Sequence, residues 1–390
     1  MKQTLFFVAG EHSGDQRGAA LITALKKSNP SFSFVGLGGG EMSRAGCQIL
    51  FDLPSIAVLG FTDVVKKYGQ FRKVFHDTLK QIEDIKPAAV ILIDFPGFNI
   101  RLAKKIKKRF PVIYYVSPQV WAWAPFRKYT IARHIHKMLT LFRFEEEVYK
   151  GTGLDVEWVG HPLVDQMNRR ANAPEIRRRL GIPEGKTVVG LLPGSRESEV
   201  SRMLPVMLGA GEIIFKDRPN CFFLVGRSTT VDAKIFENNL KPFAHLPILC
   251  LDGQSEQMLS ASDFSLICSG TATLEATILK APFLVIYKTA YLTYLFARNL
   301  MHIPYIGMAN VLARKMIVPE FVQHNAEPGK IAEKMLYYLN HPEAVQKMRK
   351  DLESVLPELG EGKAAERAAR AINDFLQTAN SLSFSTPSSI

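Results

Sequence analysis

The sequence has no long hydrophobic run and few cysteines. No uninterrupted apolar stretch in its 390 residues reaches the roughly 18 that a membrane-spanning helix needs. The apolar run at 5–9 is too short for a secretory signal. Cys47, Cys221, Cys250 and Cys268 are widely spaced, with no CxxC pair and no histidine at ligand spacing. We therefore expect a reduced cytoplasmic protein that binds no metal and no cofactor.

Common nucleotide- and nucleic-acid-binding motifs are also missing. The loop at 9–15 is not GxGxxG, and GxxxxGK[ST] occurs nowhere in the chain. These absences argue against a dinucleotide-binding domain and against a P-loop enzyme. There is no RNP, KH or helix-turn-helix pattern either, so we expect no nucleic-acid partner.

Basic residues are abundant, and they are concentrated early in the chain. The sequence has 49 Lys and Arg against 37 Asp and Glu, a formal net charge of +12, and residues 1–160 hold 23 basic and 14 acidic residues. Such an excess suits nucleic acid, anionic lipid or phosphorylated small molecules. With 47% hydrophobic residues, the chain is long enough for two globular domains.

Short apolar runs alternate with helix-like segments, which predicts parallel sheets. The first series of runs lies at 5–9, 34–37, 89–93 and 112–116, and the second at 188–192, 221–225, 248–251, 264–268 and 283–287. The predicted class is α/β, with two Rossmann-like doubly wound domains facing each other across a cleft. The predicted parts are domains at 1–165 and 166–355, a C-terminal helix at 356–380 that packs back or exchanges between protomers, and a disordered tail at 381–390.

Ligands of such sheets bind at the carboxyl ends of the strands, so the loops there are the candidate sites. Asp94 stands directly after an apolar run. Burial there would raise its pKa, as suits a general base. Alternatively, its carboxylate would cap the helix that begins near Asn99. Trp121 and Trp123 follow the apolar run at 112–116. We expect them either to form the wall of a pocket or to pack between the domains. The loop at 9–15 suits either an anion or an ordinary capped turn.

Two loops of the second half favour a nucleoside diphosphate. One contains Gly194, Ser195 and Arg196, and the other runs from Ser269 through Gly270, Thr271 and Ala272 to Thr273. Small and hydroxyl residues at helix starts expose N–H groups to phosphate, and an arginine adds a fixed positive fork. Glu275, one turn into its helix, is placed to accept hydrogen bonds from a ribose. Either loop alone has a simple capping explanation.

A basic amphipathic segment lies at 61–75. Its apolar residues recur at helical spacing with lysines and arginines between them: Phe61, Val64, Val65, Tyr68, Phe71, Val74 and Phe75. This pattern is typical of a membrane-surface helix, and it also occurs where a helix covers a core. The basic run at 101–109 is most simply a solvated helix face.

Several ordered motifs together resemble one family. They are VAGEHSGD, IDFPGFN, YVSPQVWAW, VGHPLVD, LLPGSRESEV and SGTATLE, with a late segment around Asn310. Over about residues 4–375 the chain resembles the lipid-A-disaccharide synthase family, which comprises inverting glycosyltransferases of GT-B architecture in glycosyltransferase family 19. The resemblance implies transfer of 2,3-diacylglucosamine from UDP-2,3-diacylglucosamine to the 6-hydroxyl of 2,3-diacylglucosamine 1-phosphate (lipid X). The products would be UDP and a β-1,6-linked disaccharide 1-phosphate for lipid A biosynthesis.

The resemblance also implies residue roles. Asp94 matches the family's catalytic aspartate, while Glu11, Ser13 and Asp15 match a cleft loop that holds an alternative base. Gly97 stands where some members have a second aspartate. The implied UDP-binding residues, in the second domain, are Gly194, Ser195, Arg196, Ser269, Gly270, Thr271, Ala272, Thr273, Glu275 and Asn310.

The family's substrates carry acyl chains, so the resemblance gives the segment at 61–75 a purpose. It implies that the first domain takes the acceptor and attaches peripherally, through this patch, to the anionic inner face of the cytoplasmic membrane. It also suggests a homodimer. Two alternatives stay open: another GT-B enzyme, such as a UDP-GlcNAc transferase or an epimerase, and a basic nucleic-acid-binding protein.

Overall fold

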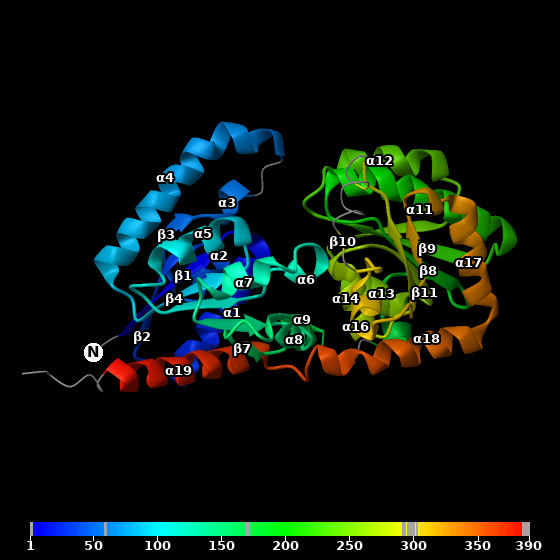
Figure 1. Cartoon of the computed structure of the whole chain (residues 1–390). Coiled ribbons are helices and arrows are strands. Elements are labelled where there is room, and N and C mark those ends of the chain that lie inside the picture. Colours follow the sequence, from blue (N-terminus) through cyan, green and yellow to red (C-terminus); the bar gives the residue numbers. More distant parts are fainter. Residues whose placement is uncertain are drawn as a thin grey trace, which may run out of the picture. The chain divides into compact units, whose positions relative to one another are not determined.

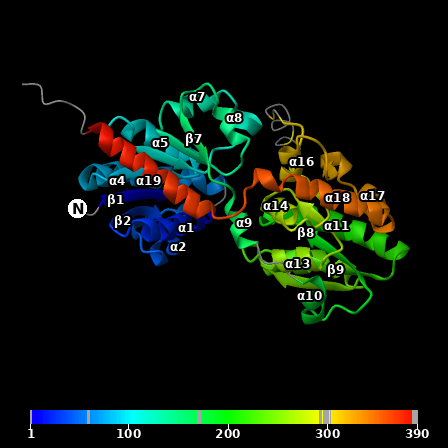
Figure 2. The ribbon, with the colours of Figure 1, turned by 90° about the horizontal axis from the view of Figure 1, so that it is seen from below.

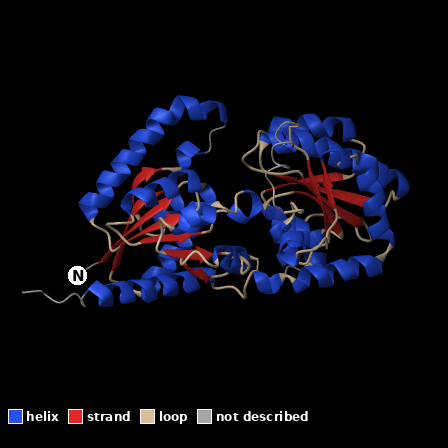
Figure 3. Cartoon of the chain, viewed as in Figure 1, coloured by secondary structure: helices blue, strands red, loops and turns tan. Residues whose placement is uncertain are grey.

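The computed structural model describes residues 3–57, 61–167, 172–290, 294, 301 and 303–383, without the side chains of 57, 61–68 and 379–383 (Figure 1). The chain divides into two compact units. Unit 1 comprises residues 1–165 and 359–390, and unit 2 comprises residues 166–358. Each unit is a parallel sheet covered by helices, so the predicted α/β class with two doubly wound units is confirmed (Figure 3).

Unit 1 contains a seven-stranded parallel sheet in the order β3-β2-β1-β4-β5-β6-β7. The strands are β1 Gln3–Ala9, β2 Phe32–Gly38, β3 Gln48–Asp52, β4 Ala89–Ile93, β5 Val112–Tyr115, β6 Lys137–Thr140 and β7 Asp155–Trp158. Every residue of β4 is buried. This is why its sequence, AVILI, is continuously apolar instead of alternating: helices cover both faces of the sheet.

The helices of unit 1 divide between the two faces of its sheet. They are α1 His12–Ser28, α2 Gly40–Arg44, α3 Pro54–Ala57, α4 Phe61–Ile85, α5 Pro96–Ile106, α6 Val120–Trp123, α7 Arg127–Ala132, α8 Glu145–Tyr149, α9 Pro162–Gln166 and α19 Ala364–Ser383. Apolar side chains of α4, α5 and α7 share one buried cluster on the sheet. On the opposite face, α19 packs against α1 (Figure 2).

Unit 2 repeats the design with a six-stranded sheet in the order β10-β9-β8-β11-β12-β13. Its strands are β8 Thr187–Leu192, β9 Cys221–Arg227, β10 Ile248–Asp252, β11 Phe264–Cys268, β12 Phe283–Tyr287 and β13 Glu320–Val322. Its helices are α10 Ala173–Arg179, α11 Glu197–Asp217, α12 Ala233–Leu240, α13 Ser255–Ala261, α14 Thr271–Ile278, α16 Met308–Ala313, α17 Pro328–Asn340 and α18 Pro342–Ser354, with 3₁₀ turns η1 Lys241–Phe243, η2 Gln323–Asn325 and η3 Leu356–Glu358.

Strand order fixes where a ligand binds. In each sheet the first strand lies next to the fourth, because β1 pairs with β4 and β8 pairs with β11. Loops after these neighbouring strands leave toward opposite faces and open a crevice at the carboxyl edge of the sheet. The crevice residues are therefore those that follow β1 and β4 in unit 1, and those that follow β8 and β11 in unit 2.

The chain returns from unit 2 to unit 1 through α19. The carboxylate of Asp165 accepts hydrogen bonds from the backbone N–H groups of Lys363 and Ala364, and thereby caps this helix. Of the predicted tail at 381–390, residues 381–383 belong to α19 and residues 384–390 lie outside the described residues. Among the described helices, none combines the length and the apolar character needed to span a bilayer.

Candidate active site

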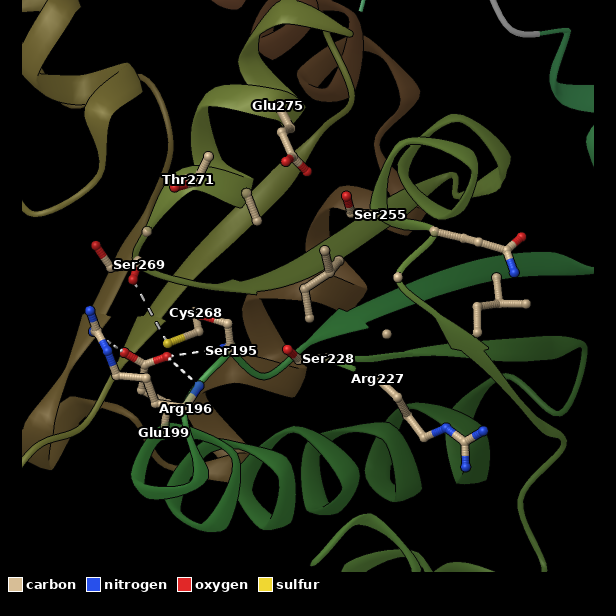
Figure 4. A pocket seen from close by; sticks show the side chains of 18 residues that line it. Ser195, Arg196, Glu199, Arg227, Ser228, Ser255, Cys268, Ser269, Thr271 and Glu275 are labelled. Atoms are coloured by element: carbon tan, nitrogen blue, oxygen red, sulfur yellow. Dashed lines mark hydrogen bonds and ion pairs between the residues drawn. The ribbon is translucent and has the colours of Figure 1, made fainter. Parts of the chain in front are cut away.

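Unit 2 has a pocket of about 340 Å³ at the carboxyl ends of β8, β9, β10 and β11 (Figure 4). These strands are neighbours in the sheet, so their loops meet. Eight of the ten predicted UDP-binding residues line the pocket: Gly194, Ser195, Arg196, Ser269, Gly270, Thr271, Ala272 and Glu275. The structure thus brings together two loops that lie more than 70 residues apart in the sequence.

Thr273 and Asn310 are not among the lining residues. The Thr273 hydroxyl donates to the Gly270 carbonyl at 2.7 Å. Asn310 is fully buried, and its side chain accepts from the N–H groups of Ile317 and Val318 and donates to Glu320. Each polar atom of its amide has a partner inside the fold, so this side chain holds the segment between α16 and β13 in place.

Glu199 of α11, which the sequence did not single out, organises the first loop. Its Oε2 accepts the backbone N–H groups of Ser195 at 3.1 Å and Arg196 at 3.3 Å, and its Oε1 accepts Arg196 Nη1 at 2.8 Å. Gly194 has φ 113°, and a Cβ there would lie 2.6 Å from Glu199 Oε2, so this turn requires glycine. The Arg196 side chain is 78% exposed and remains available to an anion.

The second loop offers donors, and its helix offers an acceptor. Thr271 and Ala272 begin α14, where the first N–H groups have no partner within the helix and favour an anion. Burial raises the pKa of Glu275, and a hydrogen bond from Ser255 lowers it. Glu275 Oε2 is buried and has no hydrogen-bond partner among the described residues. A sugar hydroxyl is the kind of group that would satisfy it.

Further lining residues follow β9 and β10. Arg227 forms two 2.7 Å hydrogen bonds with Asp252, which orient its guanidinium. The lining residues missed from the sequence are Leu192, Glu199, Gly226, Arg227, Ser228, Leu251, Gly253, Gln254, Ser255 and Cys268. Most stand at or just after strand ends that the sequence did indicate, so strand position was the available signal.

In unit 1, Asp94 stands directly after β4, at the junction with β1. Asp94 and Phe95 have φ of 47° and 48°, a left-handed conformation that costs non-glycine residues of order 1–3 kcal/mol each. Two donors hold the Asp94 carbonyl: Asn99 Nδ2 at 2.8 Å and the Tyr114 hydroxyl at 2.5 Å. This strained turn presents the Asp94 side chain at the edge of the sheet.

The Asp94 carboxyl is partly buried, with 29% of its side chain exposed. Burial raises its pKa, while Arg17 at 3.5 Å and the Phe95 N–H at 2.9 Å lower it. Arg17, on α1, was not predicted. The net direction is upward, which makes this carboxylate a stronger base than an exposed aspartate.

The loop after β1 lies against the same turn. A Cβ on Gly10 would collide with the Phe95 ring, so glycine lets this ring pack directly on the backbone of the loop. Glu11 is the N-cap residue of α1 and is exposed, and Ser13 is half-buried in the first turn. Asp15 is 2% exposed and accepts the N–H groups of Gly39, Glu41 and Met42 around the start of α2. Asp15 therefore holds the fold and is a poor candidate for a base.

A buried carboxylate supports the tryptophan loop. Glu145 Oε1 accepts Trp121 Nε1 at 3.2 Å, and its Oε2 accepts the N–H groups of Leu141 and Phe142. Burial raises the pKa of Glu145 to about 7, although its three donors lower it. Ser117 and Tyr149 share a 3.0 Å hydrogen bond in the same region. Trp121 is thus held in place, whereas Trp123 is exposed.

The segment at 61–75 forms the first part of α4. Val74 is 6% exposed and belongs to the core cluster, with Phe71 and Phe75 packed against it. Val74 is therefore a core residue and not part of an exposed patch, because this stripe of α4 faces the sheet. The side chains of Phe61, Val64, Val65 and Tyr68 lie outside the described residues.

Comparison with known proteins decides the family. The family model described as Lipid-A-disaccharide synthetase matches residues 5–375. A Lipid-A-disaccharide synthase from Syntrophus aciditrophicus (strain SB) is 39% identical over 366 residues, which is 94% of this chain and 96% of that protein. The chain belongs to the lipid-A-disaccharide synthetase family. The predicted class, a glycosyltransferase of lipid A biosynthesis, is confirmed.

Solved structures outside this family share its fold. UDP-GlcNAc 2-epimerase from Neisseria meningitidis, bound to UDP-GlcNAc, matches with a TM-score of 0.63 and 13% identity over 95% of this chain and 99% of that one. A transferase from Siraitia grosvenorii in complex with UDP matches with a TM-score of 0.58 and 13% identity over 96% and 99%. At these identities they confirm the GT-B architecture alone.

Proposed function

We propose that the chain transfers 2,3-diacylglucosamine from UDP-2,3-diacylglucosamine to the 6-hydroxyl of lipid X, with inversion at the anomeric carbon. Membership in the lipid-A-disaccharide synthetase family carries this proposal. It is supported by a pocket whose shape and polar groups suit a nucleoside diphosphate, and by a carboxylate with a raised pKa at a strand end of unit 1.

The unit 2 pocket would hold the UDP part of the donor. The diphosphate lies at the start of α14, where the N–H groups of Thr271 and Ala272 and the hydroxyl of Thr271 are donors. Arg196 adds positive charge, and Glu275 accepts from the ribose. As the bond to the sugar breaks, negative charge grows on the departing UDP, so these donors stabilise the transition state more than the ground state.

In this proposal Asp94 supplies the general base. Its carboxylate takes the proton of the acceptor 6-hydroxyl while that oxygen attacks the anomeric carbon from the face opposite the leaving UDP. Burial raises the pKa of this carboxyl, and Arg17 at 3.5 Å lowers it by favouring the ionised form. Glu11 lies on the adjoining loop and is the alternative base.

Both substrates carry acyl chains, so we also propose peripheral attachment to the inner face of the cytoplasmic membrane. The beginning of α4, with Phe61, Val64, Val65 and Tyr68 interspersed with Lys66 and Lys67, is the proposed apolar contact. A homodimer is a further proposal: light scattering of the purified chain should give about twice the 43.7 kDa of one chain, and the mass of a single chain would contradict it.

The product of a defined reaction tests the function. The purified chain is incubated in detergent with UDP-2,3-diacylglucosamine and lipid X, and the products are identified by mass spectrometry. We expect a disaccharide 1-phosphate that depends on both substrates, released with UDP. An isomerised sugar nucleotide, or transfer from UDP-GlcNAc with equal efficiency, would contradict the proposal and favour an epimerase or another GT-B transferase.

A further inference from the structure

Almost all of the net positive charge comes from one stretch of 50 residues. Residues 95–144 contain eleven Lys and Arg and no Asp or Glu, which leaves 38 basic and 37 acidic residues for the rest of the chain. Helix α4 is nearly neutral by comparison, with five basic and four acidic residues over 61–85. The basic excess therefore belongs to the segment that contains α5 and α7, and not to the amphipathic helix α4.

The fold brings α5 and α7 together. Lys107, just after α5, donates through Nζ to the backbone carbonyls of Ala132 at 3.4 Å and Arg133 at 2.9 Å, at the end of α7. Burial lowers the pKa of His134, and the nearby positive charges of Lys104, Lys107 and Arg133 lower it further. Cations from the end of α5 thus lie close to the end of α7.

Large aromatic side chains stand exposed on α6, on α7 and between these two helices. Phe126 is 73% exposed, Tyr129 51% and Trp123 46%. Arg127 lies 5.4 Å from the centre of the Trp123 ring, and Lys128 lies 5.3 Å from that of Tyr129. Half-exposed aromatics beside cations are costly to leave in water and suit a boundary between polar and apolar phases.

The charge of this region is largely uncompensated. Arg109 pairs with Glu83, and Lys137 pairs with Asp155 and Glu157. For the other nine basic residues of 95–144, no carboxylate lies within ion-pair distance in the described parts of the chain. Such charges remain available to an external anion.

We propose that the α5–α7 surface, formed by Lys104, Lys105, Phe126, Arg127, Lys128 and Tyr129, is a second membrane-contact site that binds anionic lipid headgroups. It would supply the electrostatic part of attachment, whereas α4 supplies an apolar part. Both α4 and α5–α7 pack on the same face of the unit 1 sheet through one core cluster, so both are on the side of the unit away from α19. The proposal rests on the membrane location proposed above.

A bilayer fits this surface better than RNA does. The exposed aromatics are placed beside cations and not along a strand-lined groove, and the substrates proposed above carry acyl chains. Each Lys or Arg held near an anionic bilayer strengthens binding by about five-fold, an effect that salt screens. RNA remains an outcome that the experiment can return.

Vesicle sedimentation of the full chain tests the proposal. The charge variant is Arg127→Gln with Lys128→Gln, and the aromatic variant is Phe126→Ser with Tyr129→Ser. The matched control is Lys334→Gln with Tyr337→Ser in unit 2, where Lys334 likewise lies 4.8 Å from the ring of an exposed tyrosine. Urea unfolding followed by circular dichroism checks that both units of every variant are folded.

We expect the charge variant to bind vesicles of phosphatidylethanolamine and phosphatidylglycerol on the order of 25-fold more weakly at low salt, and neutral phosphatidylcholine vesicles as the original does. The aromatic variant should bind both kinds more weakly, and the control should match the original chain.

Equal binding by all proteins would overturn this surface while leaving α4 attachment intact. So would a loss that is confined to binding of an RNA oligonucleotide. Failure of the unchanged chain to bind either vesicle would overturn membrane attachment as a whole, without touching the transfer reaction.

Discussion

At the scale of single residues, Asp94 combines position with environment. It ends a strand at the junction of the first and fourth strands, in a left-handed turn held by Asn99 and Tyr114. Asp52 also ends a strand of this sheet, but at the far edge, where it accepts the backbone N–H of Ser55. The two aspartates therefore offer a matched pair for testing the base.

Asp94→Asn should lower transfer by about 10²–10⁴-fold, because a positioned base contributes about that much. UDP affinity should be unchanged, since the donor pocket lies in unit 2. Asp52→Asn should remain near the original rate. Transfer is followed by product formation and UDP binding by calorimetry; an Asp94→Asn enzyme of nearly full activity would move the role to Glu11. For the original chain, the rate should rise with pH and then level off, because the carboxylate must lose its proton.

Burial of Glu145 in the fold disfavours its ionised form. Its pKa is about 7 in the fold against an ordinary 4.5, so between these values the folded chain binds more protons than the unfolded chain does. Glu145 therefore makes the free energy of unfolding fall as pH rises from about 4.5 to about 7. Glu145→Gln should flatten this dependence, and it should also break the Trp121 contact, because an amide N–H₂ then faces the indole N–H.

Urea unfolding at about pH 5 and about pH 8 measures this difference. The exposed neighbour Glu147, changed to Gln, is the control and should keep the original pH dependence. The indole N–H resonance of Trp121 should shift with a midpoint near pH 7 in the original chain. If the free energy of unfolding of the Glu145→Gln protein kept the original pH dependence, the Glu145 carboxyl would not be the group that titrates in this range.

Among the elements, α14 carries the most specific expectation for the donor. Glu275→Gln should weaken UDP binding by about 5–30-fold, because a hydrogen bond to a charged acceptor is replaced by a weaker one. Calorimetry with UDP and with its 2′-deoxy analogue separates the contributions. The variant should discriminate less between the two ligands, while Glu256→Gln on the neighbouring α13 should behave as the original. Unaltered UDP affinity in Glu275→Gln would remove the ribose role.

The elements also show what sequence patterns could predict. Continuous apolar runs gave the central strands of both sheets, because strands buried on both faces leave no polar position. Gly, Ser and Thr after those strands correctly indicated the pocket loops. Thr273 and Asn310 belong to the same motifs, yet their side chains turn inward to bond backbone groups, and spacing along the chain does not encode that direction.

Several charged helix residues were missed for a related reason. Arg17, Glu145 and Glu199 are charged positions on helices, where solvent exposure is the common outcome. Arg17 and Glu145 matter because of neighbours that are distant in sequence: Asp94 lies near Arg17, and Trp121 contacts Glu145. Glu199 matters because its side chain turns back to the loop just before it. The helical stripe of α4 was ambiguous in the same way, since a core face and a lipid face have the same spacing, and the structure places Val74 in the core.

At the scale of the whole molecule, the path of α19 is the feature that a dimer would alter. Within one chain, α19 packs on α1, with Asn373 Nδ2 2.9 Å from Ser28 Oγ. Ser28→Cys with Asn373→Cys should therefore be joined within a single chain by a short bismaleimide cross-linker. A monomer-sized band of altered mobility on a non-reducing gel is the expected result. A covalent dimer would show instead that α19 exchanges between protomers.

The most direct measurement of the central claim is the linkage of the sugar product. The donor is labelled with ¹³C at its anomeric carbon, the purified chain is supplied with lipid X, and the product is analysed by NMR. The account predicts that the labelled carbon appears as a β-glycoside bonded through oxygen to C6 of the acceptor glucosamine 1-phosphate. An α-linked product, attachment at another hydroxyl, or label recovered only in free or isomerised sugar would contradict it.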